Sequence, residues 1–201
     1  MMKIDFSKQD GINNKVLEVM NKIDRKEFVS KKLKNLAYKD FPLPIGLGQT
    51  ISQPYTIAKM LTLLNINKKN SILEIGTGSG YNAALMSNLS NKGKVLSLEI
   101  HEKLIKNAKK NIEKFEIKNI EIKNQDFRDL KEKFDKIIFT AGINFNQEKI
   151  IENFAKKNLK ENGILLCPFQ SGPLIILQKK KEKITKKYTS ELYRFVPLKI
   201  N

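Results

Sequence analysis

The segment SILEIGTGSGYNAALMSNL, residues 71–89, decides the fold of this chain of 201 residues. Its first part, Ser71 to Ile75, is an apolar run that predicts a buried strand. The glycine turn, Gly76 to Gly80, follows it, and a helix is predicted from Tyr81. Glycines at alternate positions let the backbone lie against a ligand, because no side chain stands in the way and positive φ angles are accessible. This order of elements indicates a nucleotide-binding turn.

Two carboxylates accompany the glycine turn. Glu74 comes just before the turn, and Glu99 ends the next predicted strand, roughly twenty residues after the turn. Both are placed to accept hydrogen bonds from a nucleoside-containing ligand. Nicotinamide and flavin enzymes use related glycine turns, so the turn alone does not identify the ligand. A carboxylate at Glu74 suits a ligand that carries an ammonium group, which favours S-adenosylmethionine over a dinucleotide.

Strands and helices alternate through the middle of the chain. After the predicted strand at 71–75 come helix 81–89, strand 95–99, helix 102–115, strand 120–124, strand 136–139, helix 147–159 and strand 163–168. This alternation predicts an α/β, Rossmann-like fold with a doubly wound, mostly parallel sheet and helices on both faces. Ligands of such sheets bind beyond the carboxyl ends of the strands, near the point where the strand order reverses.

That edge of the sheet is expected to carry Asp126 and Phe127 as well as the glycine turn and Glu99. Asp126 is placed to accept a hydrogen bond from an adenine amino group while Phe127 packs on the ring. An aspartate that caps a turn or a helix explains Asp126 equally well. The residues by themselves leave both interpretations open.

The N-terminal third predicts smaller elements. Apolar residues at helical spacing predict a helix over 13–23 that packs on the main sheet, and 26–33 predicts a short second helix. A loop is expected over 44–53. Pro54 then suits the first turn of a helix that runs to about residue 64.

The C-terminal part predicts additional strands, at 174–178, 184–188 and 192–196, the first two joined by a lysine-rich turn. The chain length fits one domain. We expect this domain to consist of N-terminal helices and a loop in 1–65, a cofactor-binding core in 66–170 and C-terminal strands in 171–201.

The chain is strongly basic. Its 38 Lys and Arg exceed its 21 Asp and Glu by 17 charges. The excess is nearly all lysine and is spread along the chain, which indicates a compositional bias more than a groove that releases counterions from nucleic acid. The densest run, Lys179 to Lys183, falls at the expected hairpin turn, where solvated lysines are ordinary.

Other features concern location and metal binding. No apolar run approaches the roughly 20 residues that span a bilayer, and Met1 to Asp10 lacks the apolar segment of a signal peptide, so a cytoplasmic location is expected. The single cysteine, Cys167, is expected in the core. His101 is expected on the surface, without the further ligands that a metal needs, so no metal site is expected.

Two longer stretches resemble a known family. LPIGLGQTISQP (residues 43–54) and LEIGTGSGY (residues 73–81) are similar to motifs of the protein-L-isoaspartate (D-aspartate) O-methyltransferases, and GQTISQP is close to diagnostic. RKEFV (25–29) and RFVPL (194–198) match the family more weakly. The resemblance covers most of the chain. It implies methyl transfer from S-adenosylmethionine to the free α-carboxylate of L-isoaspartyl and D-aspartyl residues in damaged proteins.

The resemblance also assigns roles to residues. It implies that Ser52 is catalytic, with its hydroxyl facing the methyl group, whereas the residues alone also allow Ser52 to cap the helix at Pro54. It places 49–51 as a lid over the cofactor, where plain loop packing is the alternative. The expected cofactor-binding residues are Gln49, Thr50, Ile51, Glu74, Gly76, Thr77, Gly78, Ser79, Gly80, Glu99, Asp126 and Phe127.

The chain departs from the family pattern at Ala141-Gly142-Ile143 and at Pro168-Phe169-Gln170, which leaves the range of substrates open. An RNA or DNA methyltransferase is the main alternative, and it would need a basic stripe and base-stacking aromatic residues beside the pocket. An inactive binding module is less favoured, because Ser52 and the three carboxylates are retained together. The expected partners are isoaspartyl-containing proteins, with no specific nucleic acid, no membrane and a monomeric enzyme.

Overall fold

A seven-stranded sheet forms the centre of the protein, whose computed structural model describes residues 4, 6 and 11–199. The expectation that Met1 to Asp10 carries no signal peptide falls mostly outside the described residues. The strand order is β10-β9-β7-β6-β3-β4-β5. The strands are β3 (Ser71–Ile75), β4 (Lys94–Glu99), β5 (Ile120–Asn124), β6 (Phe134–Phe139), β7 (Leu159–Pro168), β9 (Leu174–Lys180) and β10 (Lys183–Tyr188).

The five strands from β5 to β7 are parallel, β9 pairs with β7 antiparallel, and β10 pairs with β9 antiparallel. The strand order reverses beside β3, which has β4 on one side and β6 on the other. The glycine turn leaves β3 at this reversal, so it lies where ligands of doubly wound sheets bind. The predicted fold class and the strand that precedes the turn are confirmed.

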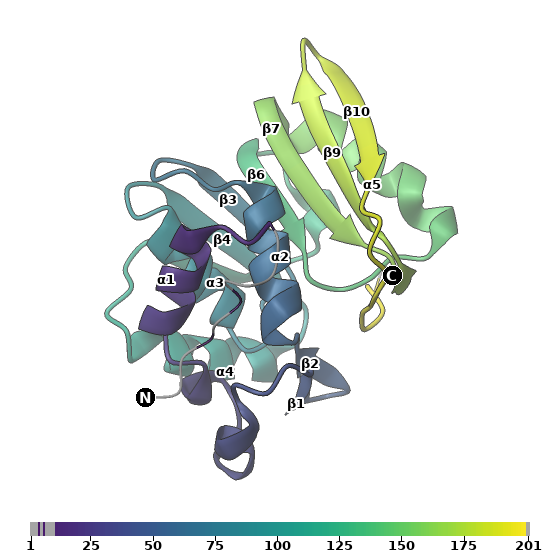
Figure 1. Ribbon diagram of the computed structural model, residues 1–201. Coiled ribbons are helices and arrows are strands. Elements are labelled where there is room, and N and C mark those ends of the chain that lie inside the picture. Colours follow the sequence, from purple (N-terminus) through teal and green to yellow (C-terminus); the bar gives the residue numbers. More distant parts are fainter. Residues whose placement is uncertain (1–3, 5, 7–10, 200–201) are drawn as a thin grey trace.

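Helices cover both faces of the sheet, as Figure 1 shows. They are α1 (Asn14–Lys22), α2 (Pro54–Leu64), α3 (Tyr81–Leu89), α4 (Glu102–Glu113) and α5 (Glu148–Asn158). One apolar cluster joins α1, α2 and α3 to one face, and a second joins α5 to the other. Strands such as β3 are buried on both faces, which explains their continuous apolar sequence.

The N-terminal region differs from its prediction in two ways. Helix α1 packs mainly against α3 and α2, and not on the sheet, because those two helices already cover this face. The expected helix at 26–33 is instead two 3₁₀ helices, η1 (Arg25–Phe28) and η2 (Lys31–Leu36), separated by extended Val29. Asp24 caps η1 by accepting from the Lys26 amide at 2.9 Å.

The expected loop at 44–53 is largely a short hairpin of β1 (Leu43–Gly46) and β2 (Gln49–Ile51). Pro54 occupies the first turn of α2, as predicted. The helix ends at Asn65, which adopts the left-handed conformation with a φ of 50°. The hairpin thus connects an exposed turn to the largely buried helix α2.

The C-terminal segment forms less strand than predicted. Only β11 (Tyr193–Arg194) forms in the expected strand 192–196, and it pairs with β8 (Ser171–Gly172). The following residues bond instead to the loops after β6 and β7. Lys181 and Glu182 form the predicted hairpin turn. Lys179 is not solvated as expected, because its side chain is buried and its Nζ contacts Glu182 at 2.9 Å.

The remaining 3₁₀ helices are η3 (Phe127–Asp129) and η4 (Phe145–Gln147). Cys167 is buried in the core, as expected. No helix within the described part of the chain combines the length and the apolar character that crossing a membrane requires.

Candidate active site

The glycine turn is held against the loop that follows β6. Gly76 has a φ of 101°, and a Cβ at this position would lie 2.3 Å from Thr140 Oγ1. The Thr140 hydroxyl donates to the Gly76 carbonyl oxygen at 2.6 Å. Both the conformation and the close contact exclude a side chain, so only glycine fits here. The turn is thereby fixed at the carboxyl edge of the sheet.

Glu74 is a fully buried carboxylate beneath this turn. Its Oε2 accepts from the Ser97 hydroxyl at 2.5 Å, and Ser97 in turn contacts the hydroxyl of inward-facing Thr77 at 2.6 Å. Its Oε1 has no hydrogen-bond partner among the residues that the structure describes. Burial raises the pKa of Glu74 to about 8, and the charge of Glu99 adds to the increase. A buried acceptor without a partner suits a cationic donor from a ligand.

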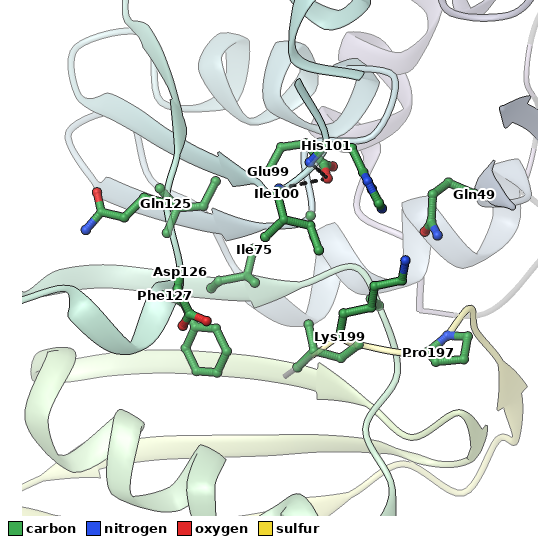
Figure 2. A pocket seen from close by; sticks show the side chains of 14 residues that line it. Gln49, Ile75, Glu99, Ile100, His101, Gln125, Asp126, Phe127, Pro197 and Lys199 are labelled. Atoms are coloured by element: carbon green, nitrogen blue, oxygen red, sulfur yellow. Dashed lines mark hydrogen bonds between the residues drawn. The ribbon is translucent and has the colours of Figure 1, made fainter. Parts of the chain in front are cut away.

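Glu99 has a different environment, although it is also buried. Its Oε2 accepts from the Gly78 amide at 3.0 Å. Its Oε1 accepts from the amides of Ile100 and His101 at 2.9 Å and 3.1 Å, the bonds drawn in Figure 2. A carboxylate offers about four lone-pair sites, so about one remains for a ligand hydroxyl.

A first hollow, here called the Phe127 pocket, lies between the ends of β4 and β5 and the C-terminal segment. Figure 2 shows Glu99 and His101 on one side of it and Asp126 and Phe127 on the other. His101 is half-buried in the wall of this pocket, whereas the sequence predicted a surface position. The lining also includes Gln49, Ile75, Gly76, Leu98, Ile100, Gln125, Ala141, Pro197, Leu198 and Lys199.

Asp126 and Phe127 both have structural contacts. Asp126 caps η3 by accepting from the Arg128 amide at 2.8 Å, and it forms a two-point ion pair with the Arg128 guanidinium. These bonds lower the pKa of Asp126. Phe127 packs edge-on against Phe139 and Phe154. The capping interpretation is thus correct, and it leaves Asp126 in the pocket wall.

A second hollow, here called the Glu74 pocket, lies between the glycine turn and the hairpin. Its polar lining includes Glu74 and Asn82, and the Asn82 Oδ1 is also buried with no partner in the residues described. It adjoins the Phe127 pocket, with which it shares Gln49, Gly76, Glu99 and Ala141. The lining includes the expected lid residues Gln49, Thr50 and Ile51, the expected catalytic residue Ser52, and the turn residues Gly76, Thr77, Gly78 and Ser79. Gly80 is the N-cap residue of α3 and lines neither of these two hollows.

Ser52 lies at the border between this pocket and a third, open hollow, here called the Tyr193 groove. Both hollows are lined by Ser52, Thr50, Thr140 and Val196. The capping alternative for Ser52 is wrong, because Gln53 holds the N-cap position of α2 and the Asp40 carboxylate accepts from the Tyr55 amide in its first turn at 2.8 Å. Ser52 therefore lies where the two hollows meet.

Several lining residues were missed from sequence because they come from the C-terminal segment, far along the chain from the glycine turn. Gly142 donates its amide to the Val196 carbonyl oxygen at 2.7 Å and accepts from the Leu198 amide at 2.7 Å. The amide of Phe195 donates to the Gln170 carbonyl oxygen at 2.9 Å. These bonds bring the C-terminal segment across the site. Residues 141–143 and 168–170, which depart from the family pattern, thus bind the C-terminal segment that closes the site.

The glycine turn, the buried carboxylates and the mostly parallel sheet together define a Rossmann-like methyltransferase. A family model described as protein-L-isoaspartate(D-aspartate) O-methyltransferase matches residues 3–201. The chain belongs to this family, which confirms the resemblance found in the sequence.

Individual relatives agree with the family match. The chain is 42% identical over 198 residues to the protein-L-isoaspartate O-methyltransferase of Thermosipho melanesiensis. This alignment covers 95% of this chain and 97% of the relative. It is 40% identical over 195 residues to that of Fervidobacterium nodosum, covering 94% and 95%.

A solved structure has the same fold. It is described as a protein-L-isoaspartate O-methyltransferase from Plasmodium falciparum in complex with S-adenosyl-L-homocysteine. The TM-score is 0.80 at 26% identity, and the alignment covers 94% of this chain and 92% of the other.

Proposed function

We propose that this protein is a repair methyltransferase that transfers a methyl group from S-adenosylmethionine to the free α-carboxylate of L-isoaspartyl and D-aspartyl residues in damaged proteins. The observation that carries the proposal is the position of Ser52, where the Glu74 pocket meets the Tyr193 groove. A methyl donor in the pocket and a peptide carboxylate in the groove meet at this border. Family membership over residues 3–201 supports the same reaction.

The residues present fit S-adenosylmethionine. The buried and unpartnered acceptors Glu74 Oε1 and Asn82 Oδ1 suit the ammonium of its methionine end. The remaining acceptor site of Glu99 suits a ribose hydroxyl, and the wall formed by Asp126 and Phe127 suits adenine. Thr50 and Ile51, with Gln49, cover the pocket from the hairpin side. The bound cofactor supplies an electrophilic methyl group on a sulfonium.

The reaction needs no general base from the protein. A carboxylate is ionised at neutral pH, so no base has to remove a proton before it attacks. One carboxylate oxygen forms a bond to the methyl carbon as the bond from that carbon to sulfur breaks, and the sulfur keeps the electron pair. The residues around Ser52 hold the carboxylate in line, and the Ser52 hydroxyl orients it. The ester product then closes to a succinimide and releases methanol.

The charges around the site do not favour a nucleic-acid substrate. The lining of the two pockets and the groove contains two basic residues, Arg194 and Lys199. It contains more acidic residues, namely Glu74, Glu99, Asp126 and Glu191. A basic stripe for phosphates is therefore lacking from this part of the described chain. Isoaspartyl-containing proteins are the proposed partners.

The proposal extends to the state of the protein. Residues 1–201 form one methyltransferase domain, composed of parts 1–65, 66–170 and 171–201. One apolar cluster with members from Ile4 to Leu174, against which Phe195 packs, supports this division into a single domain. The protein is proposed to act as a monomer. The enzyme acts in the cytoplasm, without binding membranes or a specific nucleic acid. Light scattering of the purified protein tests the monomer.

Methyl transfer from labelled cofactor to an isoaspartyl peptide, measured beside the same peptide with normal aspartate, tests the function. We expect label only in the isoaspartyl peptide, and in a base-labile ester. Equal labelling of both peptides, or of RNA in place of peptide, would contradict the proposal.

A further inference from the structure

Arg25 is a fully buried cation next to the proposed active site. Its side chain has no exposed surface. Burial lowers its pKa to about 10, and no carboxylate lies within ion-pair distance of it in the described chain. An isolated charge inside a protein is costly, so it is retained only where other contacts offset the cost.

The contacts of Arg25 join three parts of the chain. Its Nε donates to the carbonyl oxygen of Ala37, the residue that ends η2, at 2.8 Å. Its second terminal nitrogen donates to the carbonyl oxygen of Ser52 at 2.8 Å. The guanidinium lies over the ring of Tyr81, the first residue of α3, at 5.4 Å. Arg25 thus connects the 3₁₀ helices, the Ser52 segment and the helix after the glycine turn.

The bond to Ser52 holds a stretch that lies outside the regular elements. Ser52 and Gln53 lie between the end of β2 and the start of α2, outside both elements. A fixed Ser52 carbonyl fixes the backbone there, and so the direction of its side chain. A charged donor makes a stronger bond than a neutral one. The other terminal nitrogen of Arg25 is buried and has no partner in the described part of the chain, so its hydrogen bonds alone do not offset the cost of burying this charge.

We propose that Arg25 is a positioning residue, which holds Ser52 at the border of the Glu74 pocket and the Tyr193 groove through its bond to the Ser52 carbonyl oxygen. This inference rests on the proposed function. Arg25 acts through the backbone and contacts neither substrate nor the transferred methyl. It connects the 3₁₀ helices to Ser52, the proposed catalytic residue.

Arg25→Lys is the main test. Lysine keeps the charge but has a single nitrogen, which cannot reach the carbonyls of both Ala37 and Ser52 in the geometry of the guanidinium fork. We expect kcat to fall about ten- to a hundredfold, because a displaced Ser52 segment misaligns the attacking carboxylate. The dissociation constant for S-adenosylhomocysteine should change less than about threefold, since the contacts of Glu74 and Glu99 remain.

Lys26→Met is the matched control. It removes a positive charge from the next residue of η1, whose Nζ lies over the Tyr38 ring at 5.4 Å. We expect wild-type kcat from it. Arg25→Met leaves two carbonyls without a donor. The kcat of its folded fraction should fall at least as far as that of Arg25→Lys.

Hydrogen exchange provides a measurement that does not depend on activity. In Arg25→Lys, amides at 49–53 should exchange faster than in the parent, while those of 71–75 in β3 should not change. Faster exchange with unaltered kcat, or kcat that falls only in proportion to the folded fraction, would overturn the positioning role. A parent that fails to methylate isoaspartyl peptides contradicts the proposed function instead, and the exchange of 49–53 still tests the hold on Ser52.

Discussion

Replacing Glu74 with glutamine should stabilise the ligand-free protein and weaken cofactor binding. Glu74 is fully buried, and its one hydrogen bond comes from Ser97. With its pKa raised to about 8 by burial, the carboxyl is mostly protonated at pH 7. Glutamine resembles the protonated form but cannot ionise. The variant therefore avoids a buried charge and cannot provide one to a ligand ammonium.

The sign of the pH dependence follows from the raised pKa. Between about pH 4.5 and about pH 8 the folded state binds more protons at Glu74 than the unfolded state, so the contribution of this group to stability falls as the pH rises. Each unit of pKa difference corresponds to about 1.4 kcal/mol. The advantage of Glu74→Gln over the parent should thus grow by roughly 1 kcal/mol per pH unit through this window. It should level off above about pH 8.

Urea unfolding of both proteins without ligand, at intervals from pH 5 to pH 9, measures this difference. Calorimetry with S-adenosylhomocysteine should show about ten- to a hundredfold weaker binding by the variant, because a charge-assisted hydrogen bond contributes roughly 1.5–3 kcal/mol. Glu121→Gln, on exposed β5, is the control and should change neither quantity. A stability difference that is independent of pH would refute the protonation of Glu74, and unchanged affinity would remove Glu74 from the cofactor site.

Three further substitutions test other parts of the site. Glu99→Gln should lower stability by roughly 1–3 kcal/mol in urea unfolding, opposite in sign to Glu74→Gln, because its protein partners are all N–H donors and one must then face an amide NH₂. Ser52→Ala should lower single-turnover methylation about ten- to a hundredfold while the melting temperature stays near the parent's, since Ser52 caps no helix; a destabilised but fully active variant would remove it from the catalytic role. Gly142→Ala should cost roughly 1–3 kcal/mol of stability and weaken peptide binding, because its Cβ would lie 2.6 Å from the Gln170 backbone; unaltered peptide KM would show that the C-terminal segment does not shape the groove.

The departures from the sequence predictions have a common cause. Apolar spacing correctly indicated that 13–23 is a helix with one buried side, but the partner of that side is α2 and α3, which no local pattern specifies. The expected strand at 192–196 is mostly irregular. Its carbonyl and amide groups bond to Gly142 and Gln170, in loops that belong to other parts of the sheet.

The sequence by itself determined the sheet, the glycine turn and the family, because these depend on local periodicity, on the absence of side chains at Gly76 and its neighbours, and on short motifs. Only the tertiary structure decided which buried groups share an environment. It separates Glu74, with one donor, from Glu99, with three, and it places Arg25 against the carbonyl of Ser52. Protonation and positioning depend on the solvent exclusion and hydrogen bonds supplied by residues distant in the chain, and no local pattern encodes them.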